Sequence, residues 1–343
     1  MITTRRAALS ASLASAFALM LSVPALAQEV VLKLHQMLPA QAPVPALVLD
    51  PWIKKVEAES GGRIKIEMYS SMQLGGKPAD LYDQVVDGVA DIIWTLPGYT
   101  PGRFPQTEVF ELPFMMTNSE ATSRAFWDLA EKHMMDTDFK DVKVLGVFVH
   151  GPGLIHSKAP ILSVADLNGV KLRAPTRVTN MLFESLGATA VGMPVPAVPE
   201  SLSKGVIDAT VLPWEVTGAI KSSELVTNHT EFGTDSLYTS TMLIAMNKDS
   251  YNALPDDLKA VIDANSGAEF SAMAGAASQG ADAPARKIAE DRGNSIVSLT
   301  PEQIAEWKAA AEPTVARWVA ESTGFDAAAL LAEAQAAIAS YTK

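Results

Sequence analysis

Strand-like and helix-like segments alternate along the N-terminal half of the chain, and this order constrains the fold more than any other feature. The strand-like segments alternate or run continuously in apolar residues, at positions 29–38, 63–70, 91–97 and 143–150. Segments with helical spacing separate the first three, at positions 47–60 and 77–90. A β-α-β-α-β order is typical of a parallel sheet covered by helices, so the sequence predicts an α/β fold.

The same order then starts again, which predicts a second lobe. A strand at 170–174 is followed by a helix that ends at Gly187, and further elements alternate at 188–194, 197–205 and 206–213. A chain of 343 residues can bury a large core and usually divides into two units. The strongly apolar segment 239–247 is predicted to be a strand that returns to the first sheet. From Pro255 onward the chain is predicted to be mostly helical.

The N-terminus has the organisation of a secretory signal peptide. Arg5 and Arg6 form a basic head, residues 7–23 are apolar and alanine-rich, and Ala25–Ala27 offers the small residues of a cleavage site. A membrane anchor is the alternative, but this stretch is short and weakly apolar for a span of about 20 residues. We expect cleavage after Ala27. The arginine pair leaves open whether export follows the twin-arginine or the ordinary secretory route.

Charge and composition exclude several classes of function. The formal net charge is −12, and it falls to −14 when Arg5 and Arg6 are removed with the signal peptide. An acidic exported chain is poorly suited to nucleic acids or anionic membrane surfaces, and no later segment predicts membrane insertion. The chain has no cysteine, which excludes lipoprotein anchors, thiolate metal sites and cysteine nucleophiles. A soluble protein that binds a small molecule or another protein is expected.

No motif of a cofactor, metal or nucleophile site is complete. The segment at Gly151 begins like a dinucleotide turn but has His156 at the third glycine position, and the glycines at 75–76 lack the spacing of a phosphate loop. The five histidines are scattered, and no G-x-S-x-G sequence is present. We therefore predict binding without chemistry, no cofactor and no metal. An exported enzyme or a ligand-sensing protein with a similar cleft remains the alternative.

Arg173 raises a specific question within this pattern. It stands at the end of the predicted strand 170–174, where Pro175 stops the ladder, on the same side as Lys171. An arginine at a strand end has two interpretations. It can form a structural salt bridge. Alternatively, its planar guanidinium can bind the carboxylate of a ligand in a bidentate manner.

The segment around Arg173 resembles the solute-binding proteins of tripartite ATP-independent periplasmic (TRAP) transporters, the DctP-like family. The family pattern G-x-K-x-R-x-P, then L-G-A, M-P and G-x-I-D, is found at Gly169–Pro175, Leu186–Ala188, Met193–Pro194 and Gly205–Asp208. Upstream, "SGGRIKIEMYSSMQLGG" and "DGVADI" fit the same family. The resemblance covers nearly the whole mature chain.

The resemblance implies a two-lobed periplasmic binding protein fold, with mixed sheets covered by helices, a ligand cleft between the lobes and a long helix spanning both. It implies capture of a small organic acid and delivery to TRAP membrane subunits. The expected division is a signal peptide at 1–27, lobe I at 28–152 completed by about 239–282, lobe II at 153–238, and a C-terminal helical segment at 283–343 packing across the lobes.

The resemblance also assigns ligand-binding residues. Arg173 is expected to clamp the carboxylate, with Thr176 close by. The other positions expected to line the cleft are mostly apolar, namely Trp94, Met193, Val195, Leu212 and Trp214. Such a wall favours an aromatic or otherwise apolar acid over a sugar acid. Ala197 and Pro199 depart from the glutamate and aromatic residue of relatives, and the second basic residue of sialic-acid binders would align near Gly153, so a second clamp is not expected.

Three polar residues have open assignments. Glu215 accepts a hydrogen bond from a ligand hydroxyl or faces water. His35 and His150 hydrogen-bond a ligand or are satisfied structural histidines. Trp94 and Trp214 likewise line the cleft or belong to the core or the lobe interface.

The signal peptide yields a direct prediction. Mass spectrometry of the exported protein should show a mature chain that begins at Gln28. An exported protein that retains residue 1 would contradict it.

Overall fold

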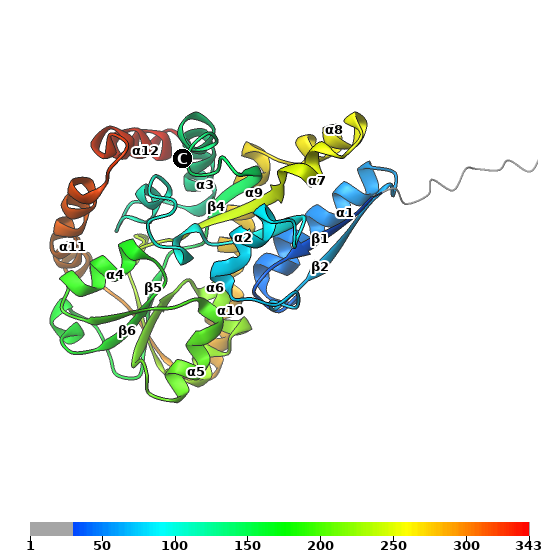
Figure 1. The fold of residues 1–343 in the computed structure, drawn as a ribbon. Coiled ribbons are helices and arrows are strands. Elements are labelled where there is room, and N and C mark those ends of the chain that lie inside the picture. Colours follow the sequence, from blue (N-terminus) through cyan, green and yellow to red (C-terminus); the bar gives the residue numbers. More distant parts are fainter. Residues whose placement is uncertain (1–29, 343) are drawn as a thin grey trace, which may run out of the picture.

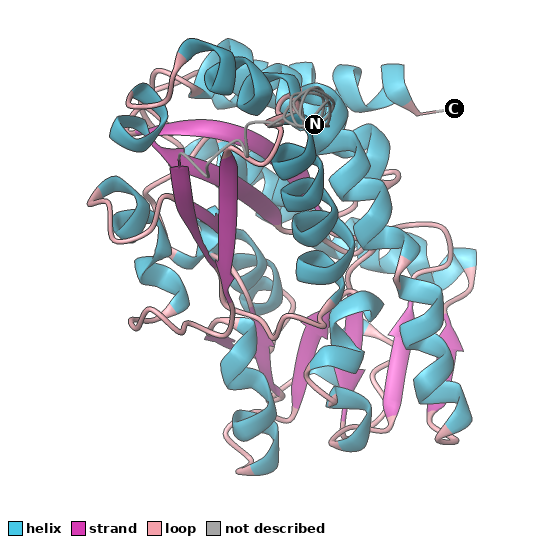
Figure 2. Cartoon of the chain, turned by 90° about the vertical axis from the view of Figure 1, so that its right-hand side faces the viewer, coloured by secondary structure: helices cyan, strands magenta, loops and turns pink. Residues whose placement is uncertain are grey.

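Two β-sheets, each with helices packed on it, make up the two lobes of this computed structural model, which describes residues 30–342 (Figure 1). The predicted signal peptide, residues 1–27, lies outside the described residues. Within 30–342, no helix is long and apolar enough to cross a bilayer. Figure 2 shows the sheets as two separate groups of strands, one above the other.

The first sheet has the strand order β2-β1-β3-β10-β4. Its strands are β1 (Val30–His35), β2 (Ile64–Tyr69), β3 (Ile92–Thr95), β4 (Val142–Val149) and β10 (Thr241–Asn247). β1 pairs in parallel with β2 and β3, whereas β10 runs antiparallel between β3 and β4. All seven residues of β10 are buried, as expected for a central strand covered on both faces. The late apolar segment therefore returns to the first sheet, as predicted.

The second sheet has the order β11-β9-β5-β8-β6-β7. Its strands are β5 (Leu154–Ser157), β6 (Lys171–Ala174), β7 (Thr189–Gly192), β8 (Ala209–Leu212), β9 (Asn228–Glu231) and β11 (Ser295–Ser298). The sequence analysis predicted β6, β7 and β8 but missed β5, β9 and β11. Each missed strand has only four residues, and β9 and β11 alternate too briefly to give a period-two signal.

The α-helices cover these sheets and carry the chain between the lobes. They are α1 (Asp50–Glu59), α2 (Leu81–Val86), α3 (Ser119–Leu129), α4 (Arg177–Ser185), α5 (Val198–Ser203), α6 (Trp214–Ala219), α7 (Lys248–Asn252), α8 (Asp256–Ala264), α9 (Ala268–Gly280), α10 (Asp282–Asp291), α11 (Pro301–Glu321) and α12 (Ala327–Tyr341). α9 packs on α3 and β4 of the first lobe, and α10, which follows at Ala281, packs on α6 of the second. Together they form the long helical element that spans both lobes.

Three of the connections between the lobes are packed against one another. The first passes through residues 151–153, the second through Tyr238, and the third through the α9–α10 junction. The Gly153 amide donates to the carbonyl of Tyr238 at 2.9 Å, and a Cβ at Gly153 would lie 2.2 Å from the Tyr238 ring. A Cβ at Gly151 would lie 2.1 Å from Asp282 Oδ2. Both glycines are therefore needed for close approach.

Candidate functional site

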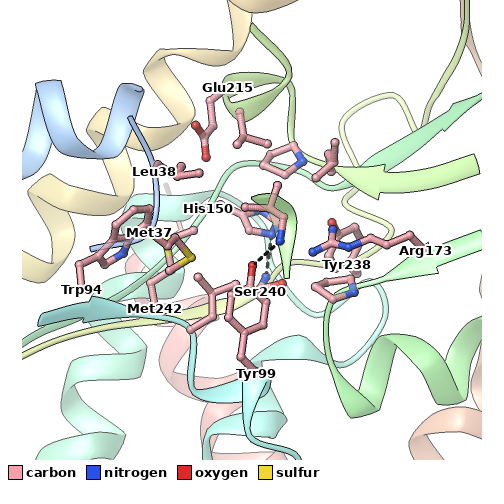
Figure 3. Close-up of a pocket in the computed structure, with 16 residues that line it drawn as sticks. Met37, Leu38, Trp94, Tyr99, His150, Arg173, Glu215, Tyr238, Ser240 and Met242 are labelled. Atoms are coloured by element: carbon pink, nitrogen blue, oxygen red, sulfur yellow. Dashed lines mark hydrogen bonds between the residues drawn. The ribbon is translucent and has the colours of Figure 1, made fainter. Parts of the chain in front are cut away.

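A small cavity of about 40 Å³ lies between the two sheets, beside these connections (Figure 3). The first sheet and its loops contribute Met37, Leu38, Trp94, Leu96, Tyr99 and His150. The second contributes Arg173, Pro175, Val195, Leu212, Glu215 and Val216, the returning connection adds Tyr238 and Ser240, and β10 of the first sheet adds Met242. Most of these side chains meet the cavity where a strand ends, the usual position of ligand sites in α/β folds.

Arg173 is buried in this cavity wall without a carboxylate partner. Only 1 % of its surface is exposed. Nε donates to the Met193 carbonyl at 2.9 Å and Nη1 to the Val211 carbonyl at 3.0 Å. No ion pair of Arg173 occurs among residues 30–342, so the salt-bridge interpretation finds no partner there. Two backbone acceptors fix the guanidinium plane while its full positive charge faces the cavity.

Tyr99 links the arginine to the opposite lobe. Its hydroxyl accepts a hydrogen bond from the Val195 amide at 3.1 Å, which joins the first lobe to the loop after β7. Burial raises the pKa of Tyr99, and the nearby Arg173 partly opposes that rise. The phenol is therefore neutral and lies close enough to Arg173 to share a bound anion.

His150 is fixed by two backbone groups and by Thr239, whose hydroxyl lies 3.2 Å from Nδ1. Its Nδ1 donates to the Gly151 carbonyl at 2.6 Å, and its Nε2 accepts from the Ser240 amide at 2.9 Å. Burial lowers the pKa of His150 to about 4, and Arg173 adds to the effect, so the ring is neutral. With both ring nitrogens occupied, His150 offers a ligand its ring surface and secures the lobe connection.

Glu215 is the opposite case, a buried acid whose carboxyl has no partner. Its exposure is 3 %, and its backbone amide donates to Asp282 Oδ1 at 2.8 Å. The carboxyl makes no hydrogen bond to another residue that the structure describes, and Oε2 is completely buried. Burial, reinforced by the charge of Asp282, raises the pKa of Glu215 to about 8. The group is thus largely protonated at neutral pH.

Two further polar atoms of the cavity-lining residues are buried without partners. They are the Nε1 of Trp94 and the hydroxyl of Ser240. The remainder of the wall is aliphatic, aromatic or thioether. A ligand that fits this wall has an apolar body, one anionic group and few other polar groups.

Four predicted residues do not line the cavity, and two of them, His35 and Trp214, are held by contacts elsewhere in the fold. His35 ends β1, where Nδ1 donates to Gln84 at 2.7 Å and Nε2 accepts from the Leu74 amide at 3.3 Å. The indole of Trp214 packs against His156 and His229 behind the cavity and donates to Glu231 at 2.9 Å. The side chains of His35 and Trp214 are thus satisfied by other residues, and the ligand contacts expected for them stay a prediction.

Met193 and Thr176 have supporting positions. Met193 supplies the carbonyl that holds Arg173, and Thr176 caps α4 through its side chain. Both line a larger groove of about 540 Å³ between the lobes, which shares Tyr99 and Pro175 with the cavity.

The sequence analysis missed several lining residues, among them Met37, Tyr99, Tyr238, Ser240 and Met242. Met37 is the second residue after the end of β1, a position that the strand-end rule identifies. Tyr99 lies in a 3₁₀ turn and Tyr238 in an irregular connection, where no periodicity marks the direction of a side chain. Among the described residues, no group of three or more histidines and acids is placed to hold a metal ion.

Two α/β lobes enclosing one cavity with a buried, unpaired arginine define a solute-binding protein. Residues 36–322 match the family described as bacterial extracellular solute-binding protein, family 7, and the chain belongs to this family. The resemblance to TRAP solute-binding proteins is thereby confirmed.

Solved structures agree with this assignment. A TRAP solute-binding protein from Rhodoferax ferrireducens T118, in complex with copurified benzoate, is 49 % identical over 91 % of this chain and 98 % of its own, with a TM-score of 0.89. A marine metagenome protein specific for aromatic acids, with 3-hydroxybenzoate, is 50 % identical over 92 % and 100 %, with a TM-score of 0.90. A Bordetella bronchiseptica protein with bound mandelate is 29 % identical over 91 % and 99 %, with a TM-score of 0.84.

The buried acid predicts a pH-dependent effect of Glu215→Gln on stability. The folded pKa of Glu215, about 8, lies above its ordinary value of 4.5. This group therefore contributes stability at low pH, and the contribution is lost as pH rises from about 4.5 to 8. Glutamine does not ionise, so the Glu215→Gln protein does not lose this stability as the pH rises. Thermal unfolding at pH 5 and pH 8 should show the melting temperature of Glu215→Gln gaining several degrees on wild type at the higher pH. An equal difference at both values would contradict a buried, neutral Glu215.

Proposed function

We propose that this protein captures a small aromatic carboxylate in the periplasm and delivers it to the membrane subunits of a TRAP transporter. The observation that carries the proposal is Arg173, a buried cation with no acidic partner among residues 30–342, in a cavity whose wall is mostly apolar. Burying an unpaired charge costs several kcal/mol, and a ligand carboxylate removes this cost by pairing with it.

The cavity wall supports an aromatic ligand. Trp94, Tyr99 and Tyr238 present rings, while Leu96, Val195 and Leu212 present aliphatic surface. A polyhydroxylated acid would leave its hydroxyls unpaired against such a wall. The benzoate, 3-hydroxybenzoate and mandelate bound by the similar proteins have the expected combination of one carboxylate and one ring.

Binding without turnover is part of the proposal. A hydrolytic site needs a nucleophile hydrogen-bonded to a base. The histidine in the cavity wall, His150, bonds through Nε2 to the amide of Ser240, while the Ser240 hydroxyl has no partner. The N-terminal segment supports export to the periplasm. A ligand-sensing role in place of transport would show as binding of the same acid without uptake by a TRAP system.

We also propose that the lobes close over the ligand. Lobe I is assigned to 28–152 and about 239–282, and lobe II to 153–238, with 283–343 packing across both. Gly98 of the first lobe approaches Thr176 of the second so closely that a Cβ at Gly98 would lie 2.4 Å from Thr176 Cγ2. Arg177 donates to the buried Glu108 across the same interface at 2.6 Å. These contacts need the lobes to be together.

Replacing Arg173 tests the clamp. Arg173→Ala removes a charge-assisted contact and leaves the ligand carboxylate unpaired, so affinity for benzoate-type acids should fall by about 2 to 5 kcal/mol, or roughly 30- to several-thousand-fold. Arg173→Lys keeps the charge but loses the planar fork and should also bind clearly worse. Calorimetric titration and thermal unfolding are measured on the same variants.

Arg124 provides the matched control for this experiment. It lies on α3, bonds to Glu269 and does not line the cavity. Arg124→Ala should change stability slightly and affinity very little. Near-native affinity in a destabilised Arg173→Ala protein would contradict the proposal that Arg173 binds the ligand carboxylate.

Gly98→Ala tests closure. The added methyl group clashes with Thr176 when the lobes are together and is free when they separate, so it opposes the bound form. Overpacking of this kind costs about 1 to 3 kcal/mol, which predicts an affinity loss of roughly 5- to 150-fold at unchanged unliganded stability. Gly280→Ala, where a Cβ meets no atom within 4 Å, is the control. Unchanged affinity in Gly98→Ala, together with no compaction on ligand addition in X-ray scattering, would argue against closure.

A further inference from the structure

The carboxyl group of Glu215 is an unexplained feature of the cavity. It is buried, it lines the cavity, and neither of its oxygens bonds to another described residue. Buried polar groups are nearly always hydrogen-bonded, because an unsatisfied one costs the full desolvation of the group. A carboxyl left in this state needs a partner that the protein itself does not supply.

The position of Glu215 separates it from the carboxylate clamp. Arg173 reaches the cavity from β6, whereas Glu215 reaches it from the start of α6. Figure 3 shows the two side chains on different sides of the cavity, with the Glu215 carboxyl pointing inward on the side of Leu38. Tyr238 lies within electrostatic reach of both groups. A ligand held by Arg173 can therefore present a second group to Glu215.

We propose that Glu215 recognises a hydroxyl group on the ligand, remote from its carboxylate, so that the protein prefers hydroxylated aromatic acids over unsubstituted ones. This inference rests on the proposed function. A hydroxyl is both donor and acceptor, and so is a protonated carboxyl, so one contact satisfies both groups. A site built to bond a hydroxyl rejects the analogue that lacks it, because the buried carboxyl is then left unpaired.

The surroundings favour a neutral hydroxyl over an ionic group. Asp282 bonds to the backbone of Glu215 and lies close enough to disfavour its ionisation. A largely neutral carboxyl cannot pair with a ligand cation as a carboxylate does. A second ligand carboxylate would meet two buried acids, and of the residues that line the cavity Arg173 is the one cation.

The test compares benzoate with the three isomers of hydroxybenzoate by calorimetric titration. In the wild type, at least one isomer should bind about 10- to 100-fold more tightly than benzoate, the effect of leaving one buried polar group unpaired. Glu215→Leu should reduce this ratio to about 2-fold or less, by weakening the hydroxybenzoate while benzoate keeps or gains affinity. Glu215→Gln retains an acceptor and a donor and should keep most of the preference.

Glu111→Gln is the matched control. Glu111 is also a buried acid with an unpartnered oxygen, but it bonds to Thr241 and does not line the cavity. Its substitution should leave the hydroxybenzoate to benzoate ratio unchanged.

The outcomes separate the two proposals. If no aromatic acid binds the wild type, the proposed function fails. If benzoate and the hydroxybenzoates bind equally, or if Glu215→Leu keeps the wild-type ratio, only the hydroxyl contact is overturned. Preferential binding of 4-(aminomethyl)benzoate, lost in Glu215→Gln, would overturn it as well by assigning a cationic group to Glu215.

Discussion

The guanidinium of Arg173, buried and held by two backbone carbonyls without an acid beside it, is the interaction on which the site depends. A structural arginine in the interior is normally paired, because removing its charge from water is expensive. Here the Met193 and Val211 carbonyls provide orientation but only partial compensation. Both carbonyls lie near the ends of the strands that flank β6, so the sheet itself sets the direction in which the Arg173 guanidinium points. This cost is offset when an anion pairs with the guanidinium.

The three packed connections link the cavity to the rest of both lobes. Gly153 lets the Tyr238 ring lie against the backbone, and Tyr238 forms part of the cavity wall. Gly151 accommodates Asp282, which binds the backbone of Glu215 at the start of α6. The connections between the lobes thus also supply side chains or contacts of the cavity wall, which is where the proposed closure would act.

Much of the first lobe follows from the sequence, because β1, β2 and β10 are long enough for hydrophobic patterning to show. The short strands β5, β9 and β11 depend on neighbours that only the assembled sheet supplies. Among site residues, Arg173, His150 and Leu212 were accessible because they stand at or next to strand ends. His35 and Trp214 lie outside the cavity, because a position at or near a strand end does not tell which way a side chain faces. Tyr99 and Tyr238 lie in irregular segments, and long-range packing alone brings them to the cavity.

The charge of the cavity differs in sign from that of the protein. The whole chain has a formal charge of −12, which would repel an anionic ligand at a distance, although salt screens this repulsion beyond about 10 Å. Inside, burial raises the pKa of Glu111 and Asp282 to about 7 and that of Glu215 to about 8. Three ionised acids would cancel Arg173 and expel a carboxylate. Their partial or full protonation leaves the arginine as the dominant charge, and the same desolvation that neutralises the acids strengthens its attraction for an anion. A cavity with one acid in its wall and two more acids close by can in this way select an acidic ligand.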